Sequence, residues 1–250
     1  MKRRIRGVVL AGGTGTRLRP LTLVTNKHLL PVYDRPMIYY PIDFLVRSGI
    51  KDICVVVGGN SVGDVLRLLK DGKDLGANQL YYVYQEGAGG ISDAIRLTRD
   101  FVGDNSSCVV LGDNIMEYNI SNELSSILDS HDWKCHVFLK NVHNPSEYGC
   151  PEFASKVDRI HRVVEKPTNP PSVYAVTGVY LFDNTVYDKI SRCIPSSRGE
   201  LEVTDVINLY AKDQNLTHSM LPGYWGDAGS ITGLYAVSAL VSKYGANKDV

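Results

Sequence analysis

The chain has 250 residues, 44% of them hydrophobic and 22% charged, which is typical of a globular protein that buries a sizeable core. Lysine plus arginine and aspartate plus glutamate number 27 each, so no overall charge attracts nucleic acid or an anionic membrane. The sequence has no run of about 18 apolar residues, and its first apolar run is too short for a secretory signal. We therefore expect a cytoplasmic protein with neither a nucleic-acid nor a membrane partner.

The cysteine and histidine patterns argue against disulfides and zinc. The cysteines are odd in number and widely spaced, and no Cys-x-x-Cys occurs. The six histidines form no pair with the spacing of metal ligands. We expect reduced cysteines at all five positions, which are Cys54, Cys108, Cys135, Cys150 and Cys193.

The first apolar run, residues 7–10, breaks into a glycine-rich stretch that reads AGGTGTR. Glycine lets backbone N–H groups approach an anion without a Cβ in the way, so a phosphate can bind there. Arg17 and Leu18 stand where a P-loop lysine and the third glycine of a dinucleotide fingerprint would be, so neither motif fits. Arg17 and Lys27 suit a polyphosphate. The structural alternative is a tight turn with solvated basic residues.

Strands and helices alternate over the first half of the chain. Apolar runs that end in glycine or polar loops predict strands, and apolar residues at helical spacing predict the helices between them. Such an alternation implies a parallel sheet covered on both faces. The expected strands are residues 7–10, 53–57, 80–84 and 108–111, and the expected helices are residues 36–46, 62–69 and 91–99.

The second half is less regular. We expect Asp183 or Asn184 to begin a helix that ends before Pro195, Thr204 to cap a helix over 206–212, and Ser230 to cap one over 231–243. No repeat or linker is present, so residues 1–250 are interpreted as a single domain. The remaining expected elements are a helix over 123–128 and strands over 135–139, 160–165, 217–221 and 174–182, the last interrupted at 177–178.

Polar residues follow several of the predicted strands. Ligands gather beyond the carboxyl ends of parallel strands, so these loops mark a candidate site. Asp113 follows a buried strand and Asp227 precedes the final helix. Mg²⁺ is usually held by one or two carboxylates plus phosphate oxygens, which two such aspartates would satisfy. Each aspartate alone could equally be a turn or cap residue.

Four further residues have both a binding and a structural interpretation. The Gln85 carboxamide offers a donor and an acceptor to a nucleobase, or belongs to an ordinary glycine loop. Glu165 and Lys166 could bind sugar hydroxyls and phosphate, or form a solvated strand end. Arg198 is either a phosphate clamp or a surface residue.

Seven motifs occur in a characteristic order: LAGGTGTRL (10–18), KHLLPV (27–32), PMIYYP (36–41), LGDN (111–114), EKP (165–167), YAVTG (174–178) and RGELEVTD (198–205). Together they resemble the sugar-1-phosphate nucleotidylyltransferases, and most closely the glucose-1-phosphate thymidylyltransferases, over nearly the whole chain. The resemblance implies a single nucleotidyltransferase domain of the α/β class, with a Rossmann-like, mostly parallel sheet and helices on both faces. It also implies a homo-oligomer.

The activity implied is Mg²⁺-dependent attack of a hexose 1-phosphate on the α-phosphorus of a nucleoside triphosphate, with pyrophosphate leaving. Positioning and charge neutralisation suffice for such a transfer, so no protein nucleophile is needed. By the family's pattern the catalytic residues are Arg17, Lys27, Asp113 and Asp227, and the two aspartates hold the metal. The nucleotide-binding residues are Leu10, Gly12, Gly13, Gly15, Thr16, His28, Gln85 and Gly90. The sugar-phosphate residues are Asn114, Tyr148, Gly149, Glu165, Lys166, Val176 and Arg198.

The chain departs from the family's pattern at three residues. Asp93 stands where the resemblance leads us to expect glutamine, and a carboxylate near a nucleotide is costly unless it is exposed or paired. His28 and Ala228 replace residues common in the longer members. The resemblance also stops before the C-terminal extension of those members, so it does not carry over the regulatory nucleotide site found there.

The leading hypothesis is an enzyme that makes dTDP-glucose from dTTP and glucose 1-phosphate. One alternative is the same reaction with UTP or another hexose 1-phosphate. A second is a catalytically silent nucleotide-sugar sensor, although retention of both aspartates with Arg17 and Lys27 argues against it. The missing third glycine disfavours an NAD-dependent dehydrogenase.

Overall fold

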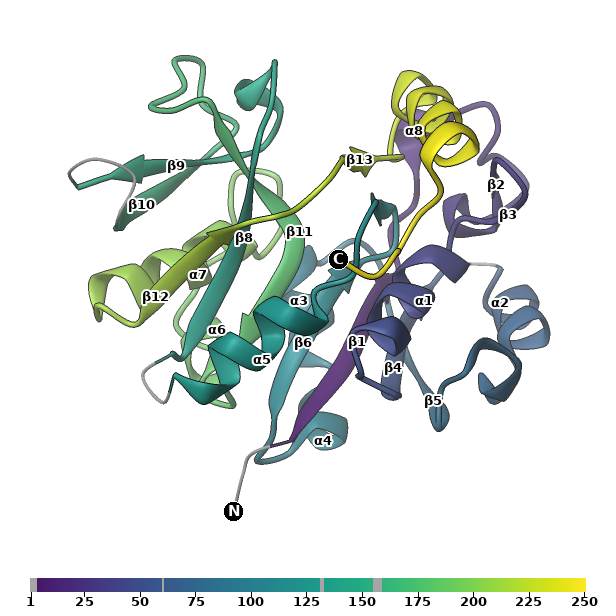
Figure 1. Cartoon of the computed structure of the whole chain (residues 1–250), viewed down its shortest axis with the longest axis horizontal. Helices are drawn as coiled ribbons and strands as arrows, with labels where there is room; N and C mark the ends of the chain where they lie inside the picture. The colour runs from purple at the N-terminus through teal and green to yellow at the C-terminus, as the bar shows by residue number, and fades with distance from the viewer. Residues whose placement is uncertain (1–3, 60, 131–132, 155–158) are drawn as a thin grey trace.

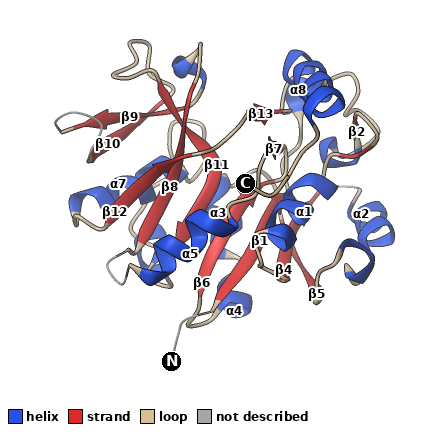
Figure 2. Cartoon of the chain, in the orientation of Figure 1, coloured by secondary structure: helices blue, strands red, loops and turns tan. Residues whose placement is uncertain are grey.

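The computed structural model describes residues 4–59, 61–130, 133–154 and 159–250. Its centre is a seven-stranded sheet in the order β12-β8-β11-β6-β1-β4-β5 (Figures 1 and 2). The neighbours β6-β1-β4-β5 are parallel, as are β8 and β12, whereas β11 is antiparallel to both β6 and β8. The expected α/β fold with a mostly parallel sheet is confirmed. The strands are β1 (Ile5–Ala11), β4 (Asp52–Gly58), β5 (Gln79–Gln85), β6 (Ser106–Leu111), β8 (Cys135–Asn141), β11 (Tyr174–Phe182) and β12 (Leu216–Met220).

Helices cover both faces of the sheet because the central strands are apolar on both sides. In β1, Val9 packs in one buried cluster and Val8 and Leu10 in the other, as the alternation of a strand requires. The Val9 cluster includes residues of α1 (Tyr39–Arg47), α2 (Val62–Leu69) and α5 (Ser121–Asp129). The opposite cluster includes residues of α3 (Ile91–Arg96), α4 (Arg99–Val102), α6 (Val186–Ile190) and α7 (Val203–Lys212).

Short elements gather beyond the carboxyl ends of the parallel strands. Figures 1 and 2 show them on the side of the sheet away from the N-terminus. Antiparallel pairing joins β9 to β10, β7 to β13 and β2 to β3. This edge therefore collects segments from the whole length of the chain. The short strands are β2 (Pro31–Val32), β3 (Arg35–Pro36), β7 (Asn114–Met116), β9 (Gly149–Phe153), β10 (Ile160–Glu165) and β13 (Trp225–Asp227). The longer helix α8 (Ile231–Tyr244) packs against β2 and β13.

Several expected boundaries are corrected. The first helix begins at Tyr39 because Pro36 pairs with Pro31 in a small hairpin. The helix expected over 91–99 is divided into α3 and α4, because the Thr98 hydroxyl donates to the Ile95 carbonyl and competes with the helical pattern. Strand β11 runs without a break, although its register with β8 shifts after Val176. The short strands β7, β9 and β13 were not predicted.

The cap predictions had mixed outcomes. Ser230 caps α8, since its hydroxyl accepts from the Gly233 amide at 3.1 Å. The Asp183 carboxylate accepts from the Thr185 amide just before α6. The prediction for Thr204 is wrong, because Thr204 lies inside α7 and its hydroxyl donates to Glu165. All five cysteines are unpaired, and all but Cys193 are buried, in agreement with the sequence analysis.

Candidate active site

The glycine loop leaves the end of β1 and wraps around the side chain of Lys27. A Cβ placed on Gly15 would lie 3.0 Å from the Lys27 Cβ, and one placed on Gly13 would lie 3.6 Å from its Nζ. Gly12 is equally confined, because a Cβ there would lie 2.6 Å from Gln85 Oε1. Leu10 is buried at the strand end, whereas Gly13 and Thr16 are exposed. The loop thus holds a lysine beneath backbone groups that face solvent.

Lys27 pairs with Asp113, which follows the neighbouring strand β6. Lys27 Nζ lies 2.5 Å from Asp113 Oδ2, and the two side chains are 14% and 9% exposed. Burial alone would raise the pKa of Asp113, but the neighbouring charges, that of Lys27 first, and the hydrogen bonds from Lys27 and Asn114 together hold that pKa below its usual range. Asp113 is therefore ionised at neutral pH.

A second carboxylate and a guanidinium converge near the first pair. A Cβ placed on Gly229 would lie 2.8 Å from Asp227 Oδ1 and 2.9 Å from both Asp113 Oδ2 and Arg17 Nη2. Three segments distant in sequence thus aim charged atoms at one point, which stays open only because residue 229 is glycine. Burial and then the nearby Asp113 charge raise the pKa of Asp227. Two carboxylates repelling each other are a common arrangement around a bound cation.

The donor set fits a hard divalent cation of the Mg²⁺ type. Two carboxylates face one opening, and Mg²⁺ takes one or two carboxylates with the remaining positions given to phosphate oxygens and water. Within the part of the chain that the structure describes, no group of three or more His, Cys, Asp or Glu side chains is placed to hold a metal. Tighter all-protein coordination, as in a structural zinc site, is therefore not built among these residues.

Gln85 ends β5 beside the glycine loop. It is 5% exposed, and its Nε2 donates to the Gly90 carbonyl at 3.1 Å and to Asp93 Oδ2 at 3.0 Å. Asp93 also accepts from Arg96 at 2.7 Å, so the carboxylate that appeared costly in the sequence is paired. The loop itself is tied down, because the Leu201 amide donates to the Gly89 carbonyl and the Ser92 amide donates to the Leu201 carbonyl.

His28 lies buried between the glycine loop and β6. Asn26 Oδ1 accepts from the His28 amide at 2.9 Å and lies 2.7 Å from the ring Nδ1, so Nδ1 carries the proton. Burial and then the Lys27 charge lower the pKa of His28 to about 3. Its Nε2, beside Gly112, has no hydrogen-bond partner among the described residues. His28 is therefore a neutral ring that presents a bare acceptor.

The β9-β10 pair assembles most of the predicted sugar-phosphate residues. Gly149 pairs with Glu165, and the Lys166 amide donates to the Tyr148 carbonyl at 3.0 Å. Glu165 is fixed by the Thr204 hydroxyl, which donates to its Oε2 at 2.5 Å. A carboxylate and the ammonium of Lys166, whose side chain is 46% exposed, thus lie side by side at one strand end.

Tyr148 connects this group to the aspartates. Its ring packs edge-on against Trp225, with the centroids 5.0 Å apart. Burial and then the negative charge of Asp227 raise the pKa of Tyr148 to about 12. Arg198 lies on another loop, where Glu202 accepts from its guanidinium at 2.8 Å and raises its pKa. The predicted sugar-phosphate residues and the loop that carries Asp227 therefore meet where Tyr148 contacts Trp225.

Two predicted sugar-phosphate residues are buried within the protein. Asn114 is 2% exposed, and its Oδ1 accepts from Trp225 Nε1 at 2.6 Å and from the Gly178 amide at 3.0 Å. Val176 is 7% exposed in β11. In this structure the Asn114 amide oxygen joins β7 to β13 and β11 by hydrogen bonds. Contact of Asn114 or Val176 with a sugar stays a prediction.

Three residues that contribute to the candidate site were not predicted from the sequence. Trp225 and Gly229 flank the predicted Asp227, and Thr204 was interpreted as a cap. Their roles depend on pairing between distant segments, such as β7 with β13. The one available signal was their place inside motifs or loops that already contained predicted residues.

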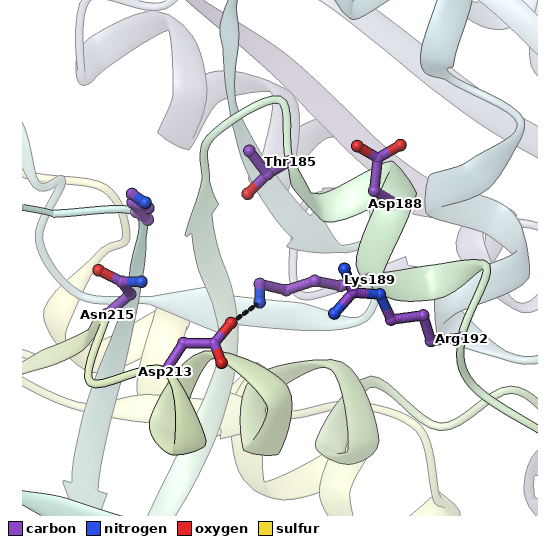
Figure 3. A pocket seen from close by; sticks show the side chains of 7 residues that line it. Thr185, Asp188, Lys189, Arg192, Asp213 and Asn215 are labelled. Atoms are coloured by element: carbon purple, nitrogen blue, oxygen red, sulfur yellow. Dashed lines mark hydrogen bonds and ion pairs between the residues drawn. The ribbon is translucent and has the colours of Figure 1, made fainter.

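A separate pocket lies away from these residues, between α6, the end of α7 and the start of β12. Figure 3 shows Lys189 and Asp213 pointing toward each other there, with Lys189 Nζ 2.6 Å from Asp213 Oδ2. None of the predicted site residues lines it. The remaining lining residues are Lys134, Thr185, Asp188, Arg192 and Asn215.

Comparison with known proteins shows the family to which the chain belongs. The family profile described as "Nucleotidyl transferase" matches residues 6–243. The glucose-1-phosphate thymidylyltransferase of Neisseria meningitidis is 37% identical over 239 residues, covering 95% of this chain and 82% of that protein. The enzyme of the same name from Xanthomonas campestris is 39% identical over 238 residues, covering 94% and 80%.

Solved structures of other proteins share this fold. A Bacillus anthracis protein provisionally assigned as a glucose-1-phosphate thymidylyltransferase, crystallised with sucrose, is 41% identical, with a TM-score of 0.89 and 95% of each chain covered. A UDP-glucose pyrophosphorylase with bound UDP-glucose shares the fold at a TM-score of 0.83 and 24% identity, covering 96% of this chain and 99% of that one. None of the described helices is both long and apolar enough to cross a bilayer.

Proposed function

Because the chain belongs to the nucleotidyl transferase family, we propose that it transfers the thymidylyl group of dTTP to glucose 1-phosphate, giving dTDP-glucose and pyrophosphate. The observation that carries the proposal is the convergence of Arg17, Asp113 and Asp227 on the opening at Gly229, next to the glycine loop. A triphosphate seated there meets backbone N–H groups, the Lys27 ammonium and a guanidinium.

The chemistry asked of the protein is mainly positioning. Two anions must approach in line, so their charges have to be offset before the sugar phosphate can attack the α-phosphorus. Arg17 and Lys27 offset charge on the triphosphate, and charge stabilisation of this kind is a large term in such transfers. Asp113 and Asp227 would hold Mg²⁺, which supplies further neutralisation of the phosphates when bound.

The sugar phosphate is proposed to bind between Tyr148, Glu165 and Lys166. The Glu165 carboxylate is held by Thr204 and suits sugar hydroxyls, while the Lys166 ammonium suits the phosphate. Tyr148 contacts Trp225, two residues before Asp227, so this subsite is adjacent to the proposed metal site. That adjacency is what a direct in-line transfer requires.

The choice of dTTP and glucose 1-phosphate is supported by the names of the curated relatives. UTP is the second candidate, because the likeness to a UDP-glucose pyrophosphorylase extends over the whole fold. We also propose a cytoplasmic location, in line with five unpaired cysteines, and a homo-oligomeric state.

The test is to incubate the purified protein with Mg²⁺, each nucleoside triphosphate and a panel of hexose 1-phosphates. Pyrophosphate release is measured, and the nucleotide sugar is identified by mass spectrometry. The expected result is fastest release from dTTP with glucose 1-phosphate. Absence of pyrophosphate from every pair, with nucleotide binding retained, would instead favour a silent nucleotide-sugar sensor.

A further inference from the structure

The amide of Gln85 can adopt only one orientation in this structure. Its Nε2 lies 3.1 Å from the Gly90 carbonyl oxygen and 3.0 Å from Asp93 Oδ2, and both partners are pure acceptors. A primary amide has two N–H donors, and both are used here. If the amide turned over, its oxygen would face a carbonyl and a carboxylate, which repel it.

The carbonyl end of the amide consequently faces the glycine loop. Gln85 Oε1 lies 2.6 Å from the place where a Cβ on Gly12 would stand, so Gly12 provides the room for this oxygen. No hydrogen bond to Oε1 is formed within the described parts of the chain. An acceptor is thus presented at the edge of the nucleotide side of the site.

Asp93 is the group that enforces this orientation. Its side chain is 16% exposed, its Oδ2 lies against Gly89 and Gln85, and its Oδ1 is paired with Arg96 at 2.7 Å. The Arg96 guanidinium takes the other carboxylate oxygen, so Oδ2 is the oxygen that faces Gln85. The Gly90 carbonyl alone would be a weaker restraint, because it also accepts from the Ala94 amide.

We propose that Asp93 is a positioning residue that sets base selectivity: by fixing Gln85 Oε1 as a bare acceptor, it favours nucleobases that carry an N–H at the centre of the Watson–Crick edge. Thymine, uracil and guanine carry such an N–H, whereas cytosine and adenine have a lone pair there and leave the acceptor unpaired. A buried acceptor left unpaired is costly, so a site built to bond a donor discriminates strongly against a ligand that lacks it. This inference rests on the proposed nucleotide subsite.

The test compares dTTP with dCTP, which are close in size and opposite in the central hydrogen-bonding group. Dissociation constants are measured by calorimetry, and kcat/KM is measured for each nucleotide where turnover occurs. The unmodified protein is expected to prefer dTTP. Asp93→Ala is expected to reduce that preference about tenfold, through weaker dTTP binding together with tighter dCTP binding.

Two matched variants separate positioning from general damage. Arg96→Ala leaves the Asp93–Gln85 contact in place and is expected to keep most of the preference. Asp93→Asn keeps the shape of the side chain, but its amide can turn and donate to Gln85 Oε1, so it is expected to lose the preference as Asp93→Ala does. An unchanged ratio in Asp93→Ala, an equal loss of affinity for both nucleotides, or no preference in the unmodified protein would overturn the proposal. Selective binding without turnover would refute the proposed function and leave the role of Asp93 standing.

Discussion

Lys27 and Asp113 form a 2.5 Å ion pair between the loops that follow two neighbouring strands, β1 and β6. Each side chain neutralises the charge of the other, and both side chains are largely buried. Burying such a pair costs desolvation free energy, and apolar residues of similar volume often leave a protein equally stable. A purely structural role therefore explains the pair poorly. We therefore propose that the two side chains are held ready for a triphosphate and a divalent cation.

Asp113→Asn should lower turnover by about 100-fold or more while the protein stays folded, since the amide keeps the shape of the side chain but not its charge. Turnover is measured by pyrophosphate release, and folding by circular dichroism. Asp188→Asn, at an exposed carboxylate beside the pocket of Figure 3, serves as the control and should be fully active. Full activity of Asp113→Asn would remove Asp113 from the catalytic set.

Arg17→Ala should have an effect of the same order, about 100-fold, without unfolding the protein. Arg17 is exposed, and its guanidinium faces the opening at Gly229 and contributes little burial. The loss should lie mainly in kcat, because the charge it offsets is that of the transfer itself. If instead KM for dTTP rose with kcat unchanged, Arg17 would be a binding group only.

Gly229→Ala tests the convergence of charges directly. A methyl group at residue 229 would lie 2.8–2.9 Å from Asp227 Oδ1, Asp113 Oδ2 and Arg17 Nη2, so it occupies the opening that they share. We expect activity to fall at least about 10-fold and the dependence on Mg²⁺ concentration to shift upward. The backbone at Gly229 is not left-handed, so alanine introduces no conformational strain.

The matched control is Gly63→Ala in α2, where a Cβ would meet nothing within 4 Å and the backbone is also not left-handed. Alanine there should leave activity unchanged and stabilise the protein by about 0.5–1 kcal/mol, because glycine in a helix is costly. Equal activities of the two alanine variants would show that the opening at Gly229 is not used.

These residues also show which parts of the candidate site could be predicted from the sequence. Asp113 was predicted because a buried apolar run ends at it, and strand ends of a parallel sheet meet at one edge. Gly229 and Trp225 could not be predicted, because their contacts depend on β13 pairing with β7 from a distant part of the chain. Local rules also misread Thr204, whose hydroxyl serves Glu165 instead of a helix end.

The same limit applies to Asp93 and Asn114. In the sequence Asp93 is only an unexpected charge, and its pairing with Gln85 and Arg96 appears once β5 and α3 are packed together. Asn114 lies in a motif that pointed to a ligand, yet its amide oxygen is taken by Trp225 and Gly178. Motifs identify where a site lies, whereas tertiary contacts decide which atoms remain free.

His136 should make stability depend on pH. It is 4% exposed, its ring nitrogens contact Thr217 and Ser219, and burial followed by the charge of His218 lowers its pKa to about 3. The unfolded chain takes up a proton near pH 6.5 and the folded chain does not, so the free energy of unfolding falls as pH drops from about 6.5 toward 3. Between pH 7 and 5 this single histidine should cost about 2 kcal/mol.

The measurement is urea unfolding of the protein and of His136→Gln at both pH values. Glutamine does not titrate, so the difference between pH 7 and 5 should shrink by about 2 kcal/mol in the variant. His28, whose pKa is also lowered to about 3, adds a similar slope to both proteins and leaves the comparison intact. The same pH dependence in both proteins would mean that His136 is protonated in the fold.

The Lys189–Asp213 pair in Figure 3 should respond asymmetrically to truncation. The Lys189 side chain is 8% exposed and its ammonium lies 4.5 Å from the centre of the Tyr210 ring, whereas the Asp213 side chain is 48% exposed. Asp213→Ala leaves a buried ammonium without its counter-ion and should destabilise the protein more than Lys189→Met does. Lys189→Met leaves only a half-exposed carboxylate and fills the same space, so it should cost less than about 0.5 kcal/mol.

Urea unfolding at pH 7 measures both values, and kcat/KM should be unchanged because the pocket contains none of the predicted site residues. A greater loss for Lys189→Met would show that the lysine contributes through the attraction itself and not through the cost of burying its charge.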